Sequence, residues 1–281
     1  MRAPEQYSCG PVVRVIVAFV TRLLRETPPM SASSYDPFAS AYNAHWGPIS
    51  LQWIPWLAVL VAPRLPSHGR VLDVCCGTGQ IAAELSRRGF RMVGLDGSRE
   101  MLRYARTNAV DAHLVQADVR QFALRSRFDA ALCLFDSLNH LLSCDDLAAA
   151  FSCVVACLRP GAWFLFDVNT PGSYERNWHG RQRRKAGDHV LRTRSEYDPE
   201  RRLGIFRASV TRVDRLSQQP TMVTLWQRCH TDAEILAALS ASGFGSVEAY
   251  SLEHGTLANG YSAHAERAFY LARRRTTRSR S

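Results

Sequence analysis

Lysine and long apolar runs are both scarce in this chain. Lys185 is the single lysine among 35 basic residues, so the positive charge comes from arginine, which we interpret as a compositional bias rather than a signature of phosphate binding. The best candidate for a membrane segment, residues 15–20, is bounded by Arg14 and Arg22 and is far shorter than the roughly 18 residues that a spanning helix needs. The sequence therefore predicts a globular protein without a membrane span.

Metal-binding cysteine motifs are also missing. The eight cysteines include no C-x-x-C pair and no cysteine and histidine spacing that suits zinc. Cys153 and Cys157 lie four residues apart in an apolar helical stretch, which is typical of buried thiols. We therefore expect free thiols, no metal and a cytoplasmic location.

Acidic residues are too few to balance the arginines, and the net charge is +10. Half of that excess lies in residues 273–281, which contain five arginines and no acid. A short run of this kind is typical of a disordered tail that aids solubility, with RNA binding as the alternative. The charge alone does not make this a nucleic-acid-binding protein.

The composition divides the chain into three parts. Residues 1–29 end in Thr27-Pro28-Pro29 and fit poorly with the segment that begins at Met30, so we interpret them as an N-terminal extension that is disordered or dispensable. Residues 30–272 are the predicted domain, and 273–281 are the basic tail. Within the domain, residues of about 170–230 are predicted to be an insertion.

Apolar strands alternate with helices through most of the domain. The first half predicts strands at 70–74, 91–95, 113–116, 128–134 and 162–168, separated by helices of about 10–15 residues. That rhythm indicates βαβ units and a doubly wound, mostly parallel sheet in the α/β class. Strands at 189–197, 202–213 and 221–229 then predict an antiparallel insertion after the fifth strand.

The strongest local motif is VLDVCCGTGQ at residues 71–80. A strand ends near Asp73, a turn contains Gly77 and Gly79, and a helix comes next. Glycine is needed where the chain turns sharply and a ligand approaches the backbone, and the helix N-terminus offers free N–H groups. The same pattern also fits a dinucleotide site, so the motif alone leaves the ligand open.

Three acids narrow the choice of ligand. Asp96 follows the second strand, 19 residues after Gly77, where it can accept hydrogen bonds from ribose hydroxyls. Asp118 follows the third strand and can bind the exocyclic amine of adenine, and Asp73 favours an ammonium or sulfonium group. A pocket with three acids suits a cationic nucleoside and argues against an NAD-dependent oxidoreductase.

The segments VLDVCCGTG, LDGSREML, QADV and FDAALCLFDSLNHL resemble class I S-adenosylmethionine-dependent methyltransferases. The resemblance covers about residues 35–272 and is closest to the bacterial small-molecule branch, which includes sugar N,N-dimethyltransferases. It implies S-adenosyl-L-methionine as the cofactor and a Rossmann-like, seven-stranded, mostly parallel sheet whose last strand is antiparallel.

The resemblance also implies a set of cofactor-binding residues. Asp73 and the glycine turn would hold the methionine part, Asp96 the ribose, and aromatic residues of the first helix would cover the cofactor. The first glycine of the family's turn is a cysteine here, which is the one departure from the pattern. The implied set is Tyr35, Tyr42, Asp73, Cys75, Gly77, Gly79, Asp96, Gly97, Met101, Asp118, Val119 and Phe135.

Candidates for catalysis come after the fourth strand. Asp136, Asn139 and His140 place a carboxylate, an amide and an imidazole in one turn at the carboxyl edge of the sheet, where ligands bind in such folds. His140 could accept a proton from an amine or hydroxyl nucleophile. The alternative is that Asp136 or Asn139 caps the next helix and His140 only lines the pocket.

The sequence predicts transfer of a methyl group to an N or O atom of a small molecule, with acidic and sugar-like acceptors as candidates. It argues against a nucleic-acid partner and leaves a monomer or a homodimer open. RNA methylation is one alternative, although the N/D-P-P-Y/F tetrapeptide of base methylation is replaced by residues 136–139. A protein that binds the cofactor without catalysis is another.

The insertion is expected to cover the active site and select the acceptor. It contains Trp178 and Trp226, and a basic cluster at residues 181–185. We interpret that cluster as a solvated loop, with phosphate binding as the alternative.

Overall fold

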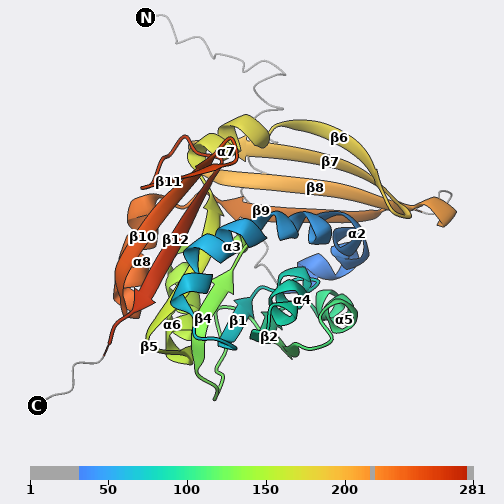
Figure 1. The fold of residues 1–281 in the computed structure, drawn as a ribbon. Helices are drawn as coiled ribbons and strands as arrows, with labels where there is room; N and C mark the ends of the chain where they lie inside the picture. Colours follow the sequence, from blue (N-terminus) through green and yellow to red (C-terminus); the bar gives the residue numbers. More distant parts are fainter. Residues whose placement is uncertain (1–31, 216–218, 277–281) are drawn as a thin grey trace, which may run out of the picture. The chain divides into compact units, whose positions relative to one another are not determined.

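The computed structural model describes residues 32–215 and 219–276, and Figure 1 shows how their helices and strands are arranged. Within these residues the larger sheet has eight strands in the order β11-β10-β12-β5-β4-β1-β2-β3. Its strands are β1 (Arg70–Val74), β2 (Arg91–Asp96), β3 (His113–Gln116), β4 (Phe128–Cys133), β5 (Leu158–Asn169), β10 (Phe244–Glu253), β11 (Thr256–Asn259) and β12 (Arg267–Arg274).

The first five strands pair in parallel, and β12 inserts antiparallel between β5 and β10. The strand order reverses beside β1, because β2 and β3 lie on one side of it and β4 and β5 on the other. In open α/β sheets, ligands bind at the carboxyl ends of the strands next to such a reversal. The topology therefore places the candidate site after β1 and β4.

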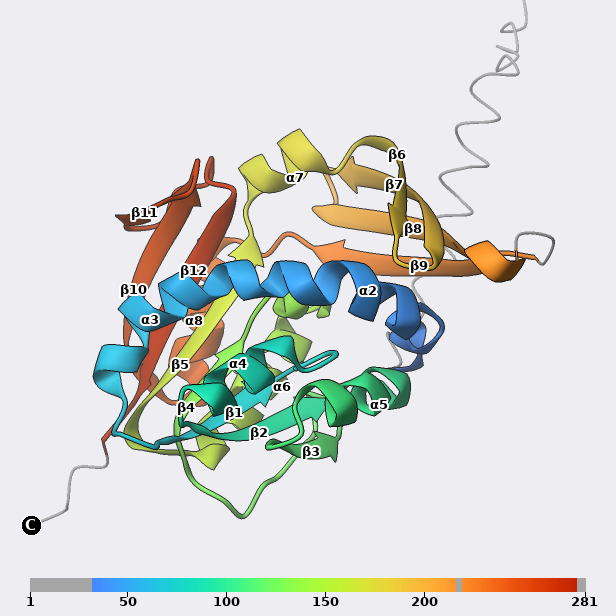
Figure 2. The same ribbon diagram turned by 45° about the vertical axis from the view of Figure 1, so that its right-hand side comes forward.

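Helices cover both faces of the larger sheet (Figure 2). Leu72 and Val74 of β1 belong to an apolar core with residues of α6 and α8, whereas Val71 packs in a second core with α3 and α4. Burial on both faces explains why the parallel strands are almost continuously apolar. The helices are α3 (Ile54–Leu60), α4 (Gln80–Arg87), α5 (Arg99–Asn108), α6 (Cys144–Cys157), α7 (Pro171–Asn177) and α8 (Asp232–Ser242), with short 3-10 helices η2 (Leu51–Trp53), η3 (Ala62–Arg64) and η4 (Ser137–His140).

The insertion forms a separate antiparallel sheet of β6 (Gly180–Ala186), β7 (His189–Asp198), β8 (Leu203–Arg212) and β9 (Thr221–Arg228), with η5 (Val213–Arg215) after β8. Its inner face packs against η1 (Ala32–Phe38) and α2 (Ala39–Ser50), which lie between the two sheets (Figure 2). Ala208 and Val210 of β8 face this core, and the alternate Arg207 and Ser209 point to the other side. The period of two in the sequence arises from this single buried face.

Three details of the predicted fold are wrong. The larger sheet has an eighth strand, because β11 pairs with β10 through a short hairpin. Residues 181–185 form β6 rather than a loop, since pairing with β7 compensates for the lack of apolar alternation. β12 continues through Arg274, whose guanidinium donates to the carbonyl of Val155 at 2.7 Å, so Arg273 and Arg274 belong to the sheet and not to a tail.

The predicted N-terminal extension lies outside the described residues, as do residues 277–281 of the predicted tail. Across 32–215 and 219–276, no helix has the length and apolar character needed to cross a membrane.

Candidate functional site

The turn after β1 forms the floor of the site. Cys75, Gly77 and Gly79 have φ angles of +58°, +55° and +86°. In this left-handed region a residue with a Cβ is strained by about 1–2 kcal/mol, whereas glycine is not. Cys75 therefore carries strain at the position where the resemblance predicts glycine. A Cβ on Gly79 would lie 3.1 Å from the Cα of Ala105, so close packing against α5 also requires glycine there.

Asp96 joins this turn to the start of α5. Its Oδ2 accepts a hydrogen bond from the Gly77 amide at 2.8 Å, and its Oδ1 accepts one from the Ser98 amide at 2.8 Å. Burial raises the pKa of the Asp96 carboxyl, and the two amide bonds oppose that rise. Gly97 comes directly after it, and its carbonyl accepts from the Gln116 side chain at 3.3 Å. The carboxylate is thus held rigidly at the carboxyl end of β2.

Asp73 provides a test of whether the residues fit the expected cofactor. The residue is 3% exposed, and its Oδ2 has no hydrogen-bond partner among the described residues. Burial, followed by the nearby charge of Asp96, raises the pKa of the Asp73 carboxyl to about 7. A buried, unpartnered carboxylate is costly unless a donor or a cation reaches it. The ammonium group of a methionine moiety would supply that partner, so the residues fit a cationic nucleoside.

The segment η1–α2 is anchored to this floor by hydrogen bonds. Asp36 accepts from the Ser98 hydroxyl at 2.5 Å. Asn43 accepts through its Oδ1 from Gln80 at 3.0 Å and from Asn108 at 2.7 Å. These bonds fix the segment over the start of α4 and over both ends of α5.

Two tyrosines of this segment lie at the site, and their contact with a cofactor stays a prediction. A Cβ on Gly77 would lie 3.6 Å from the Cε1 of Tyr42, so that ring stands over the glycine turn. The Tyr35 ring meets the Tyr42 ring edge-on at a centroid distance of 6.2 Å. Burial raises the pKa of both hydroxyls, which therefore remain neutral donors.

Three more residues of the implied cofactor-binding set, Met101, Asp118 and Val119, lie farther along the sheet edge. Met101 is buried on α5. Asp118 is paired with Arg120 at 2.6 Å, and hydrogen bonds from Arg120 lower the pKa of its carboxyl. Val119 is partly buried against the core. Contact of these residues with an adenine stays a prediction, and Asp118 would bind it with its ion pair to Arg120 in place.

The backbone of the corner after β4 is strained, and hydrogen bonds and ion pairs hold it in place. Phe135 and Asp136 have φ angles of +65° and +52°. The buried Asp167 accepts from both backbone amides, at 2.5 and 3.2 Å. Arg267 bridges Asp136 at 2.6 Å and Asp167 at 2.9 Å, which offsets the cost of burying the two carboxylates. Strain of this kind persists only where the surroundings enforce it, and it is concentrated at functional sites.

His140 lies at the centre of the polar network. Its Nδ1 is 2.7 Å from the carbonyl oxygen of Trp226, so Nδ1 carries the proton and donates. Nε2 is therefore the free acceptor, and it lies 2.7 Å from the Tyr35 hydroxyl. Burial lowers the pKa of His140, with Asp136 opposing the change. The imidazole is thus a neutral base with its lone pair directed at the tyrosine of the covering helix.

Gln227 is a residue of this network that the sequence did not predict. Its Nε2 donates to Asp136 Oδ2 at 2.6 Å and lies 3.2 Å from His140 Nε2. Its Oε1 accepts from Asn169 at 3.0 Å and from Tyr174 at 2.8 Å. It lies on β9, a strand with no recognisable motif, and only the three-dimensional pairing brings it to the site.

Asn139 is completely buried and bonded to backbone at both ends of its amide. Its Nδ2 donates to the Arg228 carbonyl at 2.8 Å, and its Oδ1 accepts from the Asn169 amide at 2.9 Å. These bonds join η4 to β5 and β9. Its predicted catalytic role is untested, and this geometry favours a role in positioning His140.

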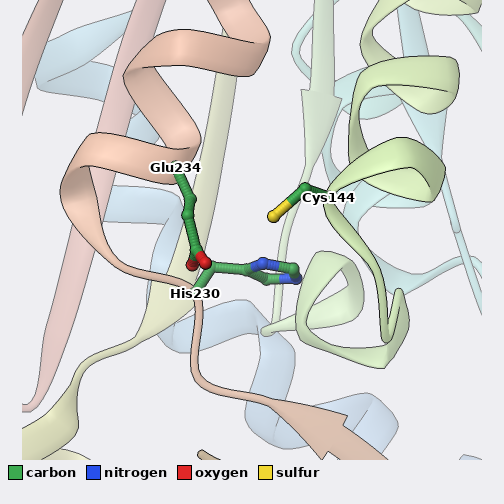
Figure 3. A group of neighbouring side chains, drawn as sticks. All are labelled: Cys144, His230 and Glu234. Carbon is green, nitrogen blue, oxygen red and sulfur yellow. The ribbon is translucent and has the colours of Figure 1, made fainter.

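Cys144, His230 and Glu234 form a group in which three possible metal ligands converge (Figure 3). The Glu234 oxygens, however, already accept from Arg202 at 2.8 and 2.9 Å, from Arg228 at 2.9 Å and from the Thr231 amide at 2.8 Å. Two guanidinium groups beside one carboxylate disfavour a further cation. We interpret the group as an ion-pair cluster that fixes the start of α8.

Known proteins match parts of this chain. Residues 71–161 match the family described as "Methyltransferase domain". A dTDP-3-amino-3,4,6-trideoxy-alpha-D-glucopyranose N,N-dimethyltransferase of Streptomyces venezuelae is 36% identical over 37% of this chain and 44% of its own length. A glycine/sarcosine N-methyltransferase of Aphanothece halophytica is 41% identical over 37% of this chain and 42% of its own. The chain spans about half the length of the curated relatives it matches.

Solved structures extend the likeness beyond the matched domain. A S-adenosylmethionine-dependent methyltransferase from Clostridium acetobutylicum superposes with a TM-score of 0.68 at 20% identity, over 86% of this chain and 99% of the other. This likeness establishes the fold, including the antiparallel insertion after β5. Residues 71–161 therefore match a methyltransferase domain, and the chain has the fold of this solved S-adenosylmethionine-dependent methyltransferase.

Proposed function

We propose that this protein transfers the methyl group of S-adenosylmethionine to a nitrogen or oxygen atom of a small-molecule acceptor, with amino sugars linked to a nucleotide as the favoured class. The observation that carries the proposal is that one site contains both the buried Asp73 carboxylate, whose Oδ2 has no partner among the described residues, and the unprotonated Nε2 of His140, which accepts from Tyr35. The first suits a cationic cofactor and the second suits a nucleophile that must lose a proton. The names of the Streptomyces relatives support the acceptor class.

Each residue has a definable part in such a reaction. S-adenosylmethionine, when bound, supplies an activated methyl group on a sulfonium. Asp73 would hold its ammonium group, Asp96 its ribose, and Tyr42 would cover it from α2. Because the leaving group is already good, the protein mainly has to align the acceptor, exclude water and take up a proton.

His140 is placed to take that proton. In the described geometry its Nε2 accepts from Tyr35, so an acceptor amine or hydroxyl would either replace the tyrosine hydroxyl or pass its proton through it. Gln227 and the Trp226 carbonyl hold the ring in one tautomer. The lowered pKa of His140 keeps the base unprotonated at neutral pH.

A thermal-shift experiment tests the cofactor part of the proposal. S-adenosylmethionine and S-adenosylhomocysteine, at about 100 times their dissociation constants, should each stabilise the protein by about 2.7 kcal/mol. For a domain of this size that corresponds to a rise in Tm of roughly 5–10 °C. NADH at the same concentration serves as the control and should have no effect. A shift with NADH alone would overturn the proposal.

The pKa of Asp73 predicts how cofactor affinity changes with pH. Because the folded, ligand-free protein holds this carboxyl protonated below about pH 7, binding of an ammonium group requires the loss of that proton. The affinity for S-adenosylhomocysteine should therefore fall about tenfold between pH 8 and pH 6, as measured by isothermal titration calorimetry. Methylthioadenosine, which lacks the amino acid part, should show little change over the same range.

Asp73→Asn supplies the matching control, because it removes the titrating group with little change in shape. Its affinity should be lower at pH 8 and nearly flat down to pH 6. A pH dependence that survives in this variant would assign the titration to another group.

A further inference from the structure

The antiparallel sheet of β6, β7, β8 and β9 has one face that packs on η1 and α2 (Figure 2) and one that does not. Residues opposite each other in the strand register share a face, and successive residues of a strand alternate between the faces. Ala208 and Val223 are opposite each other and belong to the core with α2. Arg207 and Thr224, the neighbouring pair, therefore lie on the other face, which we call the outer face.

Basic side chains gather on the outer face. Arg194 of β7 lies opposite both Arg181 of β6 and Arg207 of β8, so these three form a row across the sheet. The next row pairs two further arginines of β6 and β7, and a lysine of β6 comes two residues later. All of these side chains are exposed except that of Arg207, which is half-buried. The outer-face cluster consists of Arg181, Arg183, Lys185, Arg192, Arg194 and Arg207.

Carboxylates do not neutralise this cluster. Glu196, which is on the same face, pairs with both Arg194 and Arg207. Glu175 of α7 lies near Arg181, since both line one pocket. Among the described residues, no ion pair is found for the four other cations of the cluster. Six cations thus face two carboxylates, and the arginines that lie opposite one another repel. A bound anion would relieve this repulsion.

Acidic side chains lie at both ends of the cluster. Asp188 in the turn between β6 and β7 and Asp214 after β8 both pair with Arg212. At the other end, Asp198 pairs with Arg201 in the turn between β7 and β8. The basic surface between these ends is a strip about 14 Å long and about 10 Å wide, which corresponds to four residues of β6 and two strand spacings.

The shape and chemistry of this strip favour a single polyanionic strand over a membrane. The anionic headgroups of a bilayer extend over a wide plane and would also meet the acids at both ends. On its four strands, the described outer face exposes one large apolar side chain, that of Met222, and no Phe, Tyr or Trp. A bilayer would therefore gain little from insertion, and a nucleic-acid base would have no ring to stack on. Phosphate groups are what this surface can bind.

We propose that the outer-face cluster binds single-stranded nucleic acid through the phosphates of its backbone, without preference for base or sugar. The planar guanidinium groups of Arg181, Arg183 and Arg192 are exposed and match phosphate oxygens in a bidentate manner. This function uses none of the residues proposed for methyl transfer. It therefore stands or fails independently of that reaction.

Fluorescence anisotropy with a labelled oligouridylate of about 20 nucleotides tests this function. The titrations contain saturating S-adenosylhomocysteine and excess dTDP, so that neither site of the proposed methyl transfer is open to the probe. Each phosphate contact with a single strand contributes about 0.7 to the slope of log K against log salt, so six contacts predict a slope of about −4. Oligothymidylate of the same length should bind within about threefold of oligouridylate.

Arg183→Gln/Arg192→Gln removes two exposed cations that lie opposite each other. The slope should become shallower by about 1.4, and the affinity at low salt should fall by at least about tenfold. Arg278→Gln/Arg280→Gln is the matched control, because it removes the same charge from the C-terminal segment, for which the sequence leaves RNA binding as an alternative. This control should keep the slope of the wild-type protein.

Three results would overturn the proposal. The first is an equal loss of affinity in the two double variants, which would assign binding to overall charge. The second is the absence of binding to the oligonucleotide at low salt. The third is tighter binding to phosphatidylserine vesicles than to the oligonucleotide, with the same sensitivity to Arg183→Gln/Arg192→Gln, which would make the outer face a membrane-binding surface.

Discussion

Asp96→Ala should weaken binding of S-adenosylhomocysteine by about hundredfold, which is the largest expected effect of a single change on cofactor affinity. Hydrogen bonds to a charged acceptor contribute about 1.5–3 kcal/mol each, and a ribose offers two hydroxyls. The substitution also releases the amides of Gly77 and Ser98, which the carboxylate holds at 2.8 Å. Loss of the ligand's bonds and loosening of the glycine turn act in the same direction. Calorimetry on the folded variant measures the change.

Asp118→Ala provides the comparison, because that carboxylate also lies just after a strand end but is partly exposed and paired with Arg120. Its loss should cost much less, about tenfold or below. Thermal unfolding without ligand then separates affinity from stability. Unchanged affinity in Asp96→Ala, or an equal loss in both variants, would contradict the ribose assignment.

The parts of the site that are local in sequence could be predicted. The turn at Gly77 and Gly79 requires glycine for its backbone, and Asp96 lies at the end of a strand whose apolar run is unmistakable. Both features can be recognised from the backbone conformation and burial that their own residues require, and they lie within about 20 residues of each other in the sequence. The order of strands and helices arises in the same way from burial on both faces of the sheet.

The parts that depend on pairing across the fold could not be predicted. Gln227 reaches His140 only because β9 returns beside η4, and Arg267 reaches Asp136 only because β12 inserts next to β5. Nothing in the sequence near these residues marks them as partners of the site. β6 could not be predicted for the same reason, since its strand conformation comes from β7 and not from its own composition.

Cys75 shows how a departure from a family pattern can be interpreted from the structure. Its φ of +58° is the conformation that glycine adopts without cost, so the cysteine is strained by about 1–2 kcal/mol. The turn nevertheless keeps this conformation, because Asp96 and the packing of Gly79 against α5 hold both flanks. The strain is therefore compatible with the same ligand-binding turn.

His140→Ala should lower turnover by about hundredfold or more while leaving the affinity for S-adenosylhomocysteine within about twofold. General bases contribute about 10²–10⁴-fold in rate, and the unprotonated Nε2 of this imidazole faces the Tyr35 hydroxyl in the site. Asp73 and Asp96, the proposed cofactor residues, belong to other strand ends, and among the described residues His140 has its hydrogen bonds with Tyr35, Trp226 and Gln227 instead. Steady-state kinetics with a dTDP-linked 3-amino sugar, together with calorimetry, would measure the two effects separately.

His230→Ala is the matched control for this substitution. His230 is also a buried histidine that donates to a backbone carbonyl, that of Leu141 at 2.8 Å, but it faces Cys144 and Glu234 rather than the site. Burial lowers its pKa to about 4, as burial lowers the pKa of His140. Removal of His230 should reduce stability and leave the turnover of the folded protein nearly unchanged. Equal losses of turnover in both variants would indicate a structural role for His140.

The pH profile separates a base from a residue that only lines the pocket. Because burial holds the pKa of His140 below its ordinary value of about 6.5, the acid limb of kcat/KM in the wild-type protein should lie at a pH lower than that of an ordinary histidine, where the imidazole takes a proton. An acceptor amine also loses reactivity when it is protonated, which by itself lowers kcat/KM at acidic pH. The pH profile of the His140→Ala variant therefore serves as the reference. If His140 is the base, the acid limb assigned to it should be absent from the residual activity of His140→Ala. An identical limb in both proteins would assign the titration to the acceptor and remove His140 from the proton transfer.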